Sequence, residues 1–277
     1  MNISFPRLGI DFTLDRVAFS VFGFDVYWYG IIIAFGFAMG IFMASIAAKK
    51  LGEDKDIVLD IALICGPVSV VFARLYYCIF KWEDYAHNPL SVFDIRSGGI
   101  AIYGAIIGAV IAALIFCRVK KKNTLKIFDI GAVGLITGQM IGRWGNFVNQ
   151  EAFGSNTTLP WGMTGTRIRE YLAELKAQGY VVSPDQTVHP TFLYESIWSL
   201  ATLVLLFVII YKCYRYNGQV FFAYTSLYGL GRFWIEGLRT DSLMLGSIRI
   251  SQAVAFVCFV LFAILYFACL KKQNCDK

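Results

Sequence analysis

The sequence predicts an all-α integral membrane protein with about seven transmembrane helices, and three observations support this prediction. Of the 277 residues, 57% are hydrophobic and only 16% are charged. The mean hydropathy of +0.60 is far above that of a soluble domain of this length. The lysines also gather between the apolar stretches, in a pattern that membrane insertion produces.

Seven stretches approach the roughly 20 apolar residues that a helix needs to cross a bilayer. They lie at about 24–48, 57–80, 98–118, 126–143, 190–212, 219–239 and 248–270. The second, fourth and sixth are the least apolar. The opening residues lack a basic segment followed by an apolar run and a cleavage site, so we expect no signal peptide. Residues 1–277 are therefore predicted to form a single membrane domain.

Lysine positions predict the orientation of the chain. Lysines follow the first, third, fifth and seventh stretches, as Lys49, Lys120, Lys212 and Lys271 illustrate. Because cytoplasmic loops retain positive charge, the N-terminus is expected outside and the C-terminus in the cytosol. The net charge of +6 mostly reflects this bias. It points to anionic membrane lipids as partners, and no nucleic-acid partner is expected.

The largest segment between predicted helices, 144–188, is expected to form an extracytoplasmic head between the fourth and fifth helices. Within it, 167–178 has the pattern of a short amphipathic helix that ends near Gly179. The apolar residues on one face of this helix are Ile168, Tyr171, Leu172 and Leu175. Such a helix either covers the loop or holds a bound signal peptide.

Charged residues inside the sixth predicted helix mark a candidate functional site. Each ionisable residue in a span costs about 2.5–3.5 kcal/mol on insertion scales. Tyr228, Arg232, Glu236 and Arg239 are spaced by four, four and three residues, which places them on one helical face. The alternative to a functional site is a structural ion pair between Arg232 and Glu236 that holds the helix in register. Such a pair would not neutralise the charge of Arg239. We therefore expect this face to meet protein or water and not lipid.

A second polar group follows the fourth stretch, in "GRWGNFVNQEAFG" at 142–154. Arg143, Asn146, Asn149 and Glu151 lie within reach of one another, and the glycines permit close approach or a left-handed turn. Helix capping needs only one asparagine. An arginine is suited to a phosphate because its planar guanidinium donates two parallel hydrogen bonds and keeps its charge.

Further candidates come from "HPTFLYE" at 189–195, where a proline in the first turn marks a helix start. His189 is a cap or hydrogen-bonded spacer in the simpler interpretation and a base in the other. Tyr194 and Glu195 point into the fifth predicted helix.

Glycines and tyrosines supply the remaining candidates. Gly99 and Gly104 flank Tyr103 in "GGIAIYG", where small residues indicate either close helix packing or room for a lipid tail. Tyr29 in "WYG" belongs either to an interfacial aromatic belt or to the site.

Two classes of function fit arginines, acids, amides and tyrosines at one side of an apolar bundle. One is an enzyme that acts on an anionic phospholipid, and the other is a small-anion transporter with an Arg-lined site. A transporter more naturally has a site at the midplane, on broken helices with repeat symmetry, and the sequence shows neither. We therefore favour the enzyme. The seven cysteines show no metal-binding spacing with histidines, so we expect neither a metal nor a disulfide.

At these same residues the chain resembles the prolipoprotein diacylglyceryl transferase family of bacterial plasma membranes. The stretch "GRWGNFVNQEAFG" fills every fixed position of that family's signature, G-R-x-G-N-F-x-N-x-E-x-x-G. The segments "WYG", "GGIAIYG" and "HPTFLYE" and the R-x-x-x-E-x-x-R run at 232–239 match in the same order, so the resemblance covers essentially the whole chain.

The resemblance implies a reaction, its partners and its location. The sn-1,2-diacylglyceryl group of phosphatidylglycerol is transferred to the lipobox cysteine thiol of a prolipoprotein. A thioether forms and glycerol 1-phosphate is released, as the first step of lipoprotein maturation. The active site of such a multi-pass plasma-membrane enzyme is expected toward the outer leaflet. No cofactor is implied.

Carried over by position, the resemblance implies that Arg143 acts on phosphatidylglycerol and that Arg232 and Glu236 form a second essential pair. Tyr103 departs from better-studied members, which have a histidine proposed as the base. The residues expected to bind phosphatidylglycerol are Arg143, Asn146, Asn149, Glu151, Gly154, Tyr29, Gly99, Gly104, Tyr194, Glu195, Tyr228 and Arg239.

The proposed chemistry also follows from the residue types. A free thiol has a pKa of about 8.5 and only the thiolate attacks, so nearby arginines favour the reactive form. Fixed arginines also stabilise the phosphate leaving group, and the loss of one such donor costs about 100–1000-fold in rate. For the base, Tyr103 and His189 rank level, followed by Glu151 or a field-activated thiol without a base. The predicted catalytic residues are Arg143, Arg232, Tyr103, Glu236 and His189.

Overall fold

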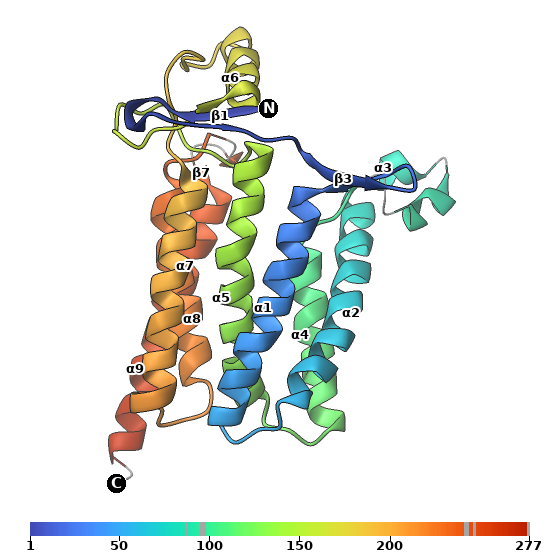
Figure 1. Ribbon diagram of the computed structural model, residues 1–277. Helices are drawn as coiled ribbons and strands as arrows, with labels where there is room; N and C mark the ends of the chain where they lie inside the picture. Colours follow the sequence, from blue (N-terminus) through green and yellow to red (C-terminus); the bar gives the residue numbers. More distant parts are fainter. Residues whose placement is uncertain (87, 95–97, 241–243, 246–247, 276–277) are drawn as a thin grey trace.

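A computed structural model of the chain describes residues 1–86, 88–94, 98–240, 244–245 and 248–275. Long helices run side by side and form one bundle (Figure 1). They are α1 (Trp28–Lys50), α2 (Asp56–Phe80), α4 (Ile102–Val119), α5 (Thr124–Asn149), α7 (Thr191–Val208), α8 (Gln219–Glu236) and α9 (Ile250–Cys275). A π-helical turn, η3 (Ile209–Cys213), continues α7. Each of the predicted apolar stretches is thus mostly helical.

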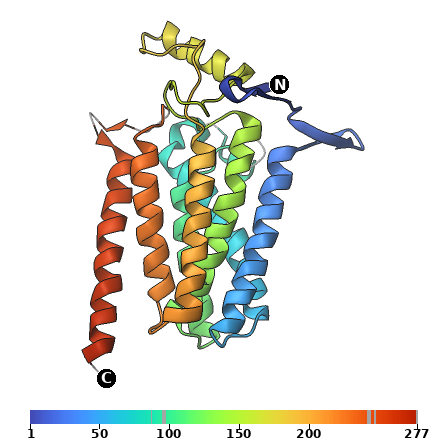
Figure 2. The same ribbon diagram turned by 60° about the vertical axis from the view of Figure 1, so that its left-hand side comes forward.

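Six helices in the described part of the chain are long and apolar enough to cross a membrane, one fewer than predicted. The exception is α8, which carries Gln219, Arg232 and Glu236 within 18 residues. It lies between α7 and α9 in the bundle (Figure 2) and also packs against α5. Its polar residues are thus sheltered by neighbouring helices, which is where charged groups in a membrane bundle are tolerated.

The all-α prediction is incomplete, because short strands lie at one end of the bundle. They are β1 (Asn2–Phe5), β2 (Ile10–Thr13), β3 (Val17–Val21), β4 (Phe24–Tyr27), β5 (Thr164–Gly165), β6 (Met244–Leu245) and β7 (Ile248–Arg249). Residues 24–27, predicted to begin the first helix, instead form β4, which pairs antiparallel with β3. The strands are rich in valine and phenylalanine, and the two turn residues between them, Phe22 and Gly23, both have positive φ, as in a type I′ hairpin.

The same end of the bundle carries a small folded unit that we call the head, which consists of β1, β2 and residues 150–188. β1 pairs antiparallel with both β2 and β5, so the N-terminal strand completes a sheet with a segment about 160 residues later. The predicted amphipathic helix is confirmed as α6 (Thr166–Ala177). Its apolar residues Ile168 and Leu172 are fully buried in the head core, and Gly179 follows with φ +89°.

The boundary predicted between the fourth helix and the head was wrong. α5 continues through the polar signature to Asn149, six residues beyond the predicted end, and stops at Gln150 in the left-handed conformation. The polar residues of this segment occupy the last turns of the helix because other helices and the head satisfy them there. The short helices near the head end are η1 (Pro6–Leu8), α3 (Trp82–Tyr85) and η2 (Pro89–Phe93).

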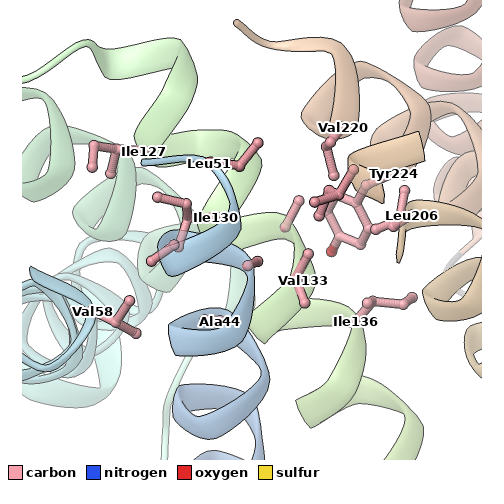
Figure 3. Close-up of a cluster of buried hydrophobic side chains, with 14 of the residues drawn as sticks. Ala44, Leu51, Val58, Ile127, Ile130, Val133, Ile136, Leu206, Val220 and Tyr224 are labelled. Carbon is pink, nitrogen blue, oxygen red and sulfur yellow. The ribbon is translucent and has the colours of Figure 1, made fainter. Parts of the chain in front are cut away.

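The main apolar core lies toward the opposite end of the bundle, where α1, α5, α7 and α8 contribute Ala44, Val133, Leu206 and Tyr224 (Figure 3). α1 and α5 approach closely, since a Cβ on Gly40 would lie 2.8 Å from a backbone oxygen of α5. Only 6% of the apolar window of α9 is buried within the chain, which is typical of a lipid-facing helix.

A buried carboxylate fixes the beginning of α8. Asp129 of α5 is fully buried and accepts hydrogen bonds from the backbone N–H groups of Gly218 (2.7 Å) and Phe221 (2.8 Å). The Tyr214 hydroxyl donates to the same carboxylate at 2.8 Å. This cap from a neighbouring helix satisfies N–H groups that α8 itself leaves unpaired. It anchors the helix that carries Arg232 and Glu236.

Candidate active site

Five charged side chains from different parts of the chain meet at the head end of the bundle. Glu195 of α7 forms ion pairs with Arg143 of α5 and, through Oε1, with Arg232 of α8 at 3.1 Å. Arg239, which follows α8, lies 3.9 Å from the same oxygen. Arg232 also contacts Glu236 at 2.5 Å. We call these five residues the arginine cluster; Glu195 is its centre.

The arginine cluster has one excess positive charge in a poorly solvated position. Its three arginines outnumber its two glutamates, and the side chain of Glu195 is only 7% exposed. Electrostatic attraction is much stronger in such surroundings than in water. The cluster as a whole is therefore suited to a ligand with one negative charge.

The stripe predicted on the sixth helix is only partly correct. Arg232 and Glu236 form the expected pair four residues apart. α8 ends at Glu236, however, so Arg239 lies beyond the helix, where its backbone pairs with that of Gly154. Arg239 still reaches Glu195, and backbone pairing with residues 154–155 holds this segment in place. Sequence spacing thus identified the residues but not the geometry that brings them together.

The signature residues form a chain of polar contacts that starts at the arginine cluster. Arg143 approaches the side-chain oxygen of Asn146 at 3.5 Å, and Asn146 donates to Glu151 at 2.9 Å. Asn149 also faces Glu151, at 3.4 Å. Glu151 is exposed, so this chain connects the partly buried guanidinium of Arg143 with the surface.

Gln150 was missed by the sequence analysis, although it is almost completely buried beside these residues. Its side chain accepts from the backbone N–H of Arg167 at 3.0 Å and donates to the carbonyl of Asn2 at 3.2 Å. It therefore joins the end of α5 to α6 and to β1. The sequence does not indicate this role of Gln150, because its partners Asn2 and Arg167 lie far away along the chain.

Two glycines of the signature are needed for close packing. A Cβ on Gly145 would lie 2.8 Å from the ring of Tyr29, so α5 holds this tyrosine against its last turns. The sequence left two roles open for the signature glycines, close approach or a left-handed turn, and Gly145 has the first of them. A Cβ on Gly154 would lie 2.7 Å from His189 and 3.0 Å from the carbonyl of Leu238. Gly154 thus allows the segments before α7 and after α8 to meet above the cluster.

The "GGIAIYG" glycines also have packing roles. The carbonyls of Gly98 and Gly99 accept from the guanidinium of buried Arg74, and Gly99 has φ +76°. A Cβ on Gly104 would lie 2.4 Å from a backbone oxygen of α2, so this glycine permits contact between α2 and α4. Tyr103 is the second residue of α4, is 42% exposed and makes no side-chain hydrogen bond with the residues that the structure describes.

His189 belongs to a hydrogen-bonded chain beside the start of α7. Its Nδ1 lies 3.2 Å from the hydroxyl of Tyr194, which accepts from the indole N–H of Trp161 at 2.7 Å. Burial lowers the pKa of His189 below its ordinary value, which keeps the imidazole neutral. Tyr194 also stacks on Trp234 of α8. These contacts fit both the spacer and the base interpretations of His189.

The space between α7 and α8 beside the cluster is almost filled. Glu195, Tyr228 and Arg232 line a cavity of about 10 Å³, enough for about one water molecule. Trp198, which the sequence analysis missed, closes this space, since a Cβ on Gly231 would lie 2.3 Å from its ring. A ligand larger than water would therefore need to reach the cluster from another side.

Comparison with known proteins assigns the family. The family model for prolipoprotein diacylglyceryl transferase matches residues 16–268. The phosphatidylglycerol–prolipoprotein diacylglyceryl transferase of Clostridioides difficile (strain 630) is 44% identical over 244 residues, which cover 88% of this chain and 91% of the relative. Proteins of the same name from Bacillus cereus (strain Q1) and Bacillus anthracis (strain A0248) are each 42% identical over 268 residues, 95% of both chains. The chain belongs to the prolipoprotein diacylglyceryl transferase family.

Proposed function

We propose that the arginine cluster holds the phosphate of phosphatidylglycerol while the diacylglyceryl group passes to a prolipoprotein thiol. As a family member, the chain is a multi-pass membrane transferase of lipoprotein biosynthesis. The observation that carries the proposal is the convergence of three arginines on the single carboxylate of Glu195. Together with Glu236, these groups carry an excess charge of +1, which matches the one negative charge of a phosphodiester.

In the proposed reaction, a cysteine sulfur of the prolipoprotein attacks the glycerol carbon that bears the phosphate. A C–S bond forms, the C–O bond to the phosphate breaks, and glycerol phosphate leaves with the electron pair. Negative charge therefore builds on the phosphate oxygens as the thiolate charge is lost. Arg143, Arg232 and Arg239 are positioned by ion pairs before the substrate arrives, so they need little rearrangement to stabilise that charge.

The thiol proton has more than one acceptor available. The positive cluster favours the thiolate, and Glu151 is an exposed carboxylate connected to Arg143 through Asn146. We propose that the arginine field acts together with Glu151, while His189 positions Tyr194 and Trp161. Tyr103→Phe and His189→Gln are then expected to retain most of the activity, and Glu151→Gln is expected to lose more.

We also propose that the head end of this single membrane domain faces outward, so that the cluster meets the outer leaflet. The loops at the other end of the bundle carry the lysines that predict the cytosolic side, and α9 ends there (Figure 1). A prolipoprotein that emerges from the membrane then presents its cysteine beside the site.

The decisive test measures glycerol phosphate released by the purified protein from phosphatidylglycerol and a lipobox peptide. Arg143→Ala is expected to lower the rate about 100-fold or more, because it removes one fixed donor. Arg118→Ala is the matched control. It removes an exposed arginine in the last turn of α4, at the end of the bundle away from the head, and is expected to keep the wild-type rate. Full activity of Arg143→Ala would show that the phosphate binds elsewhere.

A further inference from the structure

An open pocket lies beside the last turn of α5, where Asn149 lines it. Its volume is about 510 Å³. Most of its lining residues belong to β4 and the start of α1, where the β3–β4 hairpin projects from the top of α1 (Figure 1). We call it the hairpin pocket; its lining residues are Arg16, Asp25, Val26, Tyr27, Tyr29, Gly30 and Asn149. The proposed function does not use most of these residues.

The hairpin pocket contains an arginine whose hydrogen-bonding capacity is unused. The Nε of Arg16 is buried and has no hydrogen-bond acceptor among the described residues. The backbone carbonyl of Arg16 accepts from the N–H of Trp28, which fixes this residue at the start of α1. A buried unpaired donor is costly. Because Arg16 as a whole is only partly buried, its terminal guanidinium nitrogens are the donors available to a ligand in the pocket.

Other groups in the pocket are complementary to a peptide backbone. The first turn of α1 offers backbone N–H groups, because the helix has no side-chain cap. Asp25 accepts from Ser20 at 2.6 Å and offers further acceptor capacity. β4 pairs with β3 along one edge, and no strand covers its other edge within the described part of the chain. Such an edge is suited to an added extended segment.

The charge of the hairpin pocket favours a peptide over a second phospholipid. Arg16 and Asp25 both line it, so its ionic groups balance. A phosphate would meet the carboxylate of Asp25 as well as the guanidinium of Arg16. A polypeptide, in contrast, offers carbonyl oxygens to Arg16 and N–H groups to Asp25.

Hydrogen bonds and packing connect the pocket with the proposed site. Asn149 lines the pocket and faces Glu151, which continues through Asn146 to Arg143. Tyr29 also lines the pocket, and its ring lies against Gly145, two residues after Arg143. A chain seated here thus lies next to the last turns of α5.

We propose that the hairpin pocket binds the extended segment of the prolipoprotein that follows the acceptor cysteine, an inference that rests on the proposed function. The apolar signal segment before the cysteine remains among lipids and helices. The polar residues after the cysteine extend along β4. Arg16 donates a hydrogen bond to one of their carbonyls, and Asp25 accepts a hydrogen bond from one of their N–H groups. This docking places the thiol on the side of α5 that leads to Arg143.

The first test locates the peptide on the wild-type full-length protein in phosphatidylglycerol-containing nanodiscs. The probe is a lipobox peptide with serine in place of the acceptor cysteine and a photoreactive residue two positions later. Cross-links to Phe24–Tyr27 or Arg16 are expected. Cross-links confined to α6 or to the far end of the bundle would overturn the proposal. Because this peptide does not react, the result is independent of the chemistry at the arginine cluster.

The second test separates peptide binding from lipid binding by kinetics. Arg16→Ala is expected to raise the KM for the cysteine peptide roughly tenfold, as for loss of a charge-assisted hydrogen bond, without changing the KM for phosphatidylglycerol. Asp25→Asn is expected to shift the peptide KM in the same direction by a smaller factor. Lys176→Ala, which removes an exposed charge on α6, is the control and is expected to leave both constants unchanged.

The outcomes of this second test distinguish the two proposals. An unchanged peptide KM in Arg16→Ala, or a raised KM for the lipid alone, would overturn peptide docking and leave the proposed function intact. A wild-type protein that releases no glycerol phosphate would instead contradict the proposed function, while the cross-linking result would still report on the pocket.

Discussion

Glu195 illustrates how one residue sets the properties of the site. Its carboxylate forms ion pairs with three arginines, so its removal increases the surplus of positive charge in a poorly solvated position. We expect Glu195→Gln to destabilise the fold by about 3–5 kcal/mol, the cost typical of breaking a buried ion pair. Thermal unfolding in detergent measures this effect. Glu174→Gln, an exposed change on α6, is the control and is expected to leave the melting temperature unchanged.

The same variant also tests the nature of the ligand. A phosphate at the cluster replaces the lost negative charge, so phosphatidylglycerol is expected to raise the melting temperature of Glu195→Gln more than that of the wild type. A neutral diacylglycerol is the control lipid. Equal stabilisation of both proteins by both lipids would contradict binding of the headgroup phosphate at these arginines.

His189 gives the protein a predictable response to acid. Because its pKa in the folded protein lies below the ordinary value of about 6.5, the unfolded chain takes up a proton first as the pH falls. Stability is therefore expected to decline from about pH 6.5 down to the lower pKa of the folded state. His189→Gln should flatten this part of the curve of melting temperature against pH. An unchanged slope in the variant would assign the decline to other groups.

Sequence reasoning identified the charged residues of the site more readily than their neighbours. Arg143, Arg232 and Glu236 are recognisable because ionisable groups are rare in apolar helices. Gln150 and Trp198 were missed, since an amide or an indole near a helix end is ordinary until its distant partners are known. An ionisable residue in an apolar helix is not always part of the site, since four backbone carbonyls satisfy the guanidinium of Arg74 in α2.

At the scale of elements, the contact between α1 and α5 controls the position of Tyr29. Gly145→Ala would place a Cβ 2.8 Å from the Tyr29 ring, so the ring has to move away from the last turns of α5. We expect a clear loss of transferase activity. Gly131→Ala on the same helix is the matched control, because its new Cβ meets no atom within 4 Å and alanine favours helix. Equal activity of the two variants would show that the position of Tyr29 is unimportant.

Hydropathy predicted the long helices well and the strands poorly. A helix that crosses lipid needs a long apolar run, which is visible without knowledge of its neighbours. The β3–β4 hairpin consists of short apolar segments that merge with the first helix in such a scan, although Gly23 marks the turn. The end of α5 was misplaced for a related reason: its polar residues resemble a loop until the partners in α7, α8 and the head are known.

For the whole molecule, the orientation in the membrane is the main prediction that remains to be tested. We expect a cysteine introduced by Lys176→Cys in the head, in a background without other cysteines, to react with an impermeant maleimide on intact cells. A protein that keeps only Cys213, which is exposed at the far end of the bundle, should react only after permeabilisation. The reverse pattern would place the head in the cytosol and contradict the proposed access of prolipoproteins to the site.

The carboxylate at the centre of the arginine cluster also bears on how quickly the enzyme completes a cycle. Three unpaired arginines would hold glycerol phosphate, which gains charge as it leaves, and would slow its departure. Because Glu195 already pairs with these guanidinium groups, the proposed function implies that a phosphate enters by exchange with this carboxylate and departs when the internal ion pairs re-form. On that proposal, the internal ion pairs weaken the attraction for the lipid but favour product release, a step that limits the rate of many enzymes.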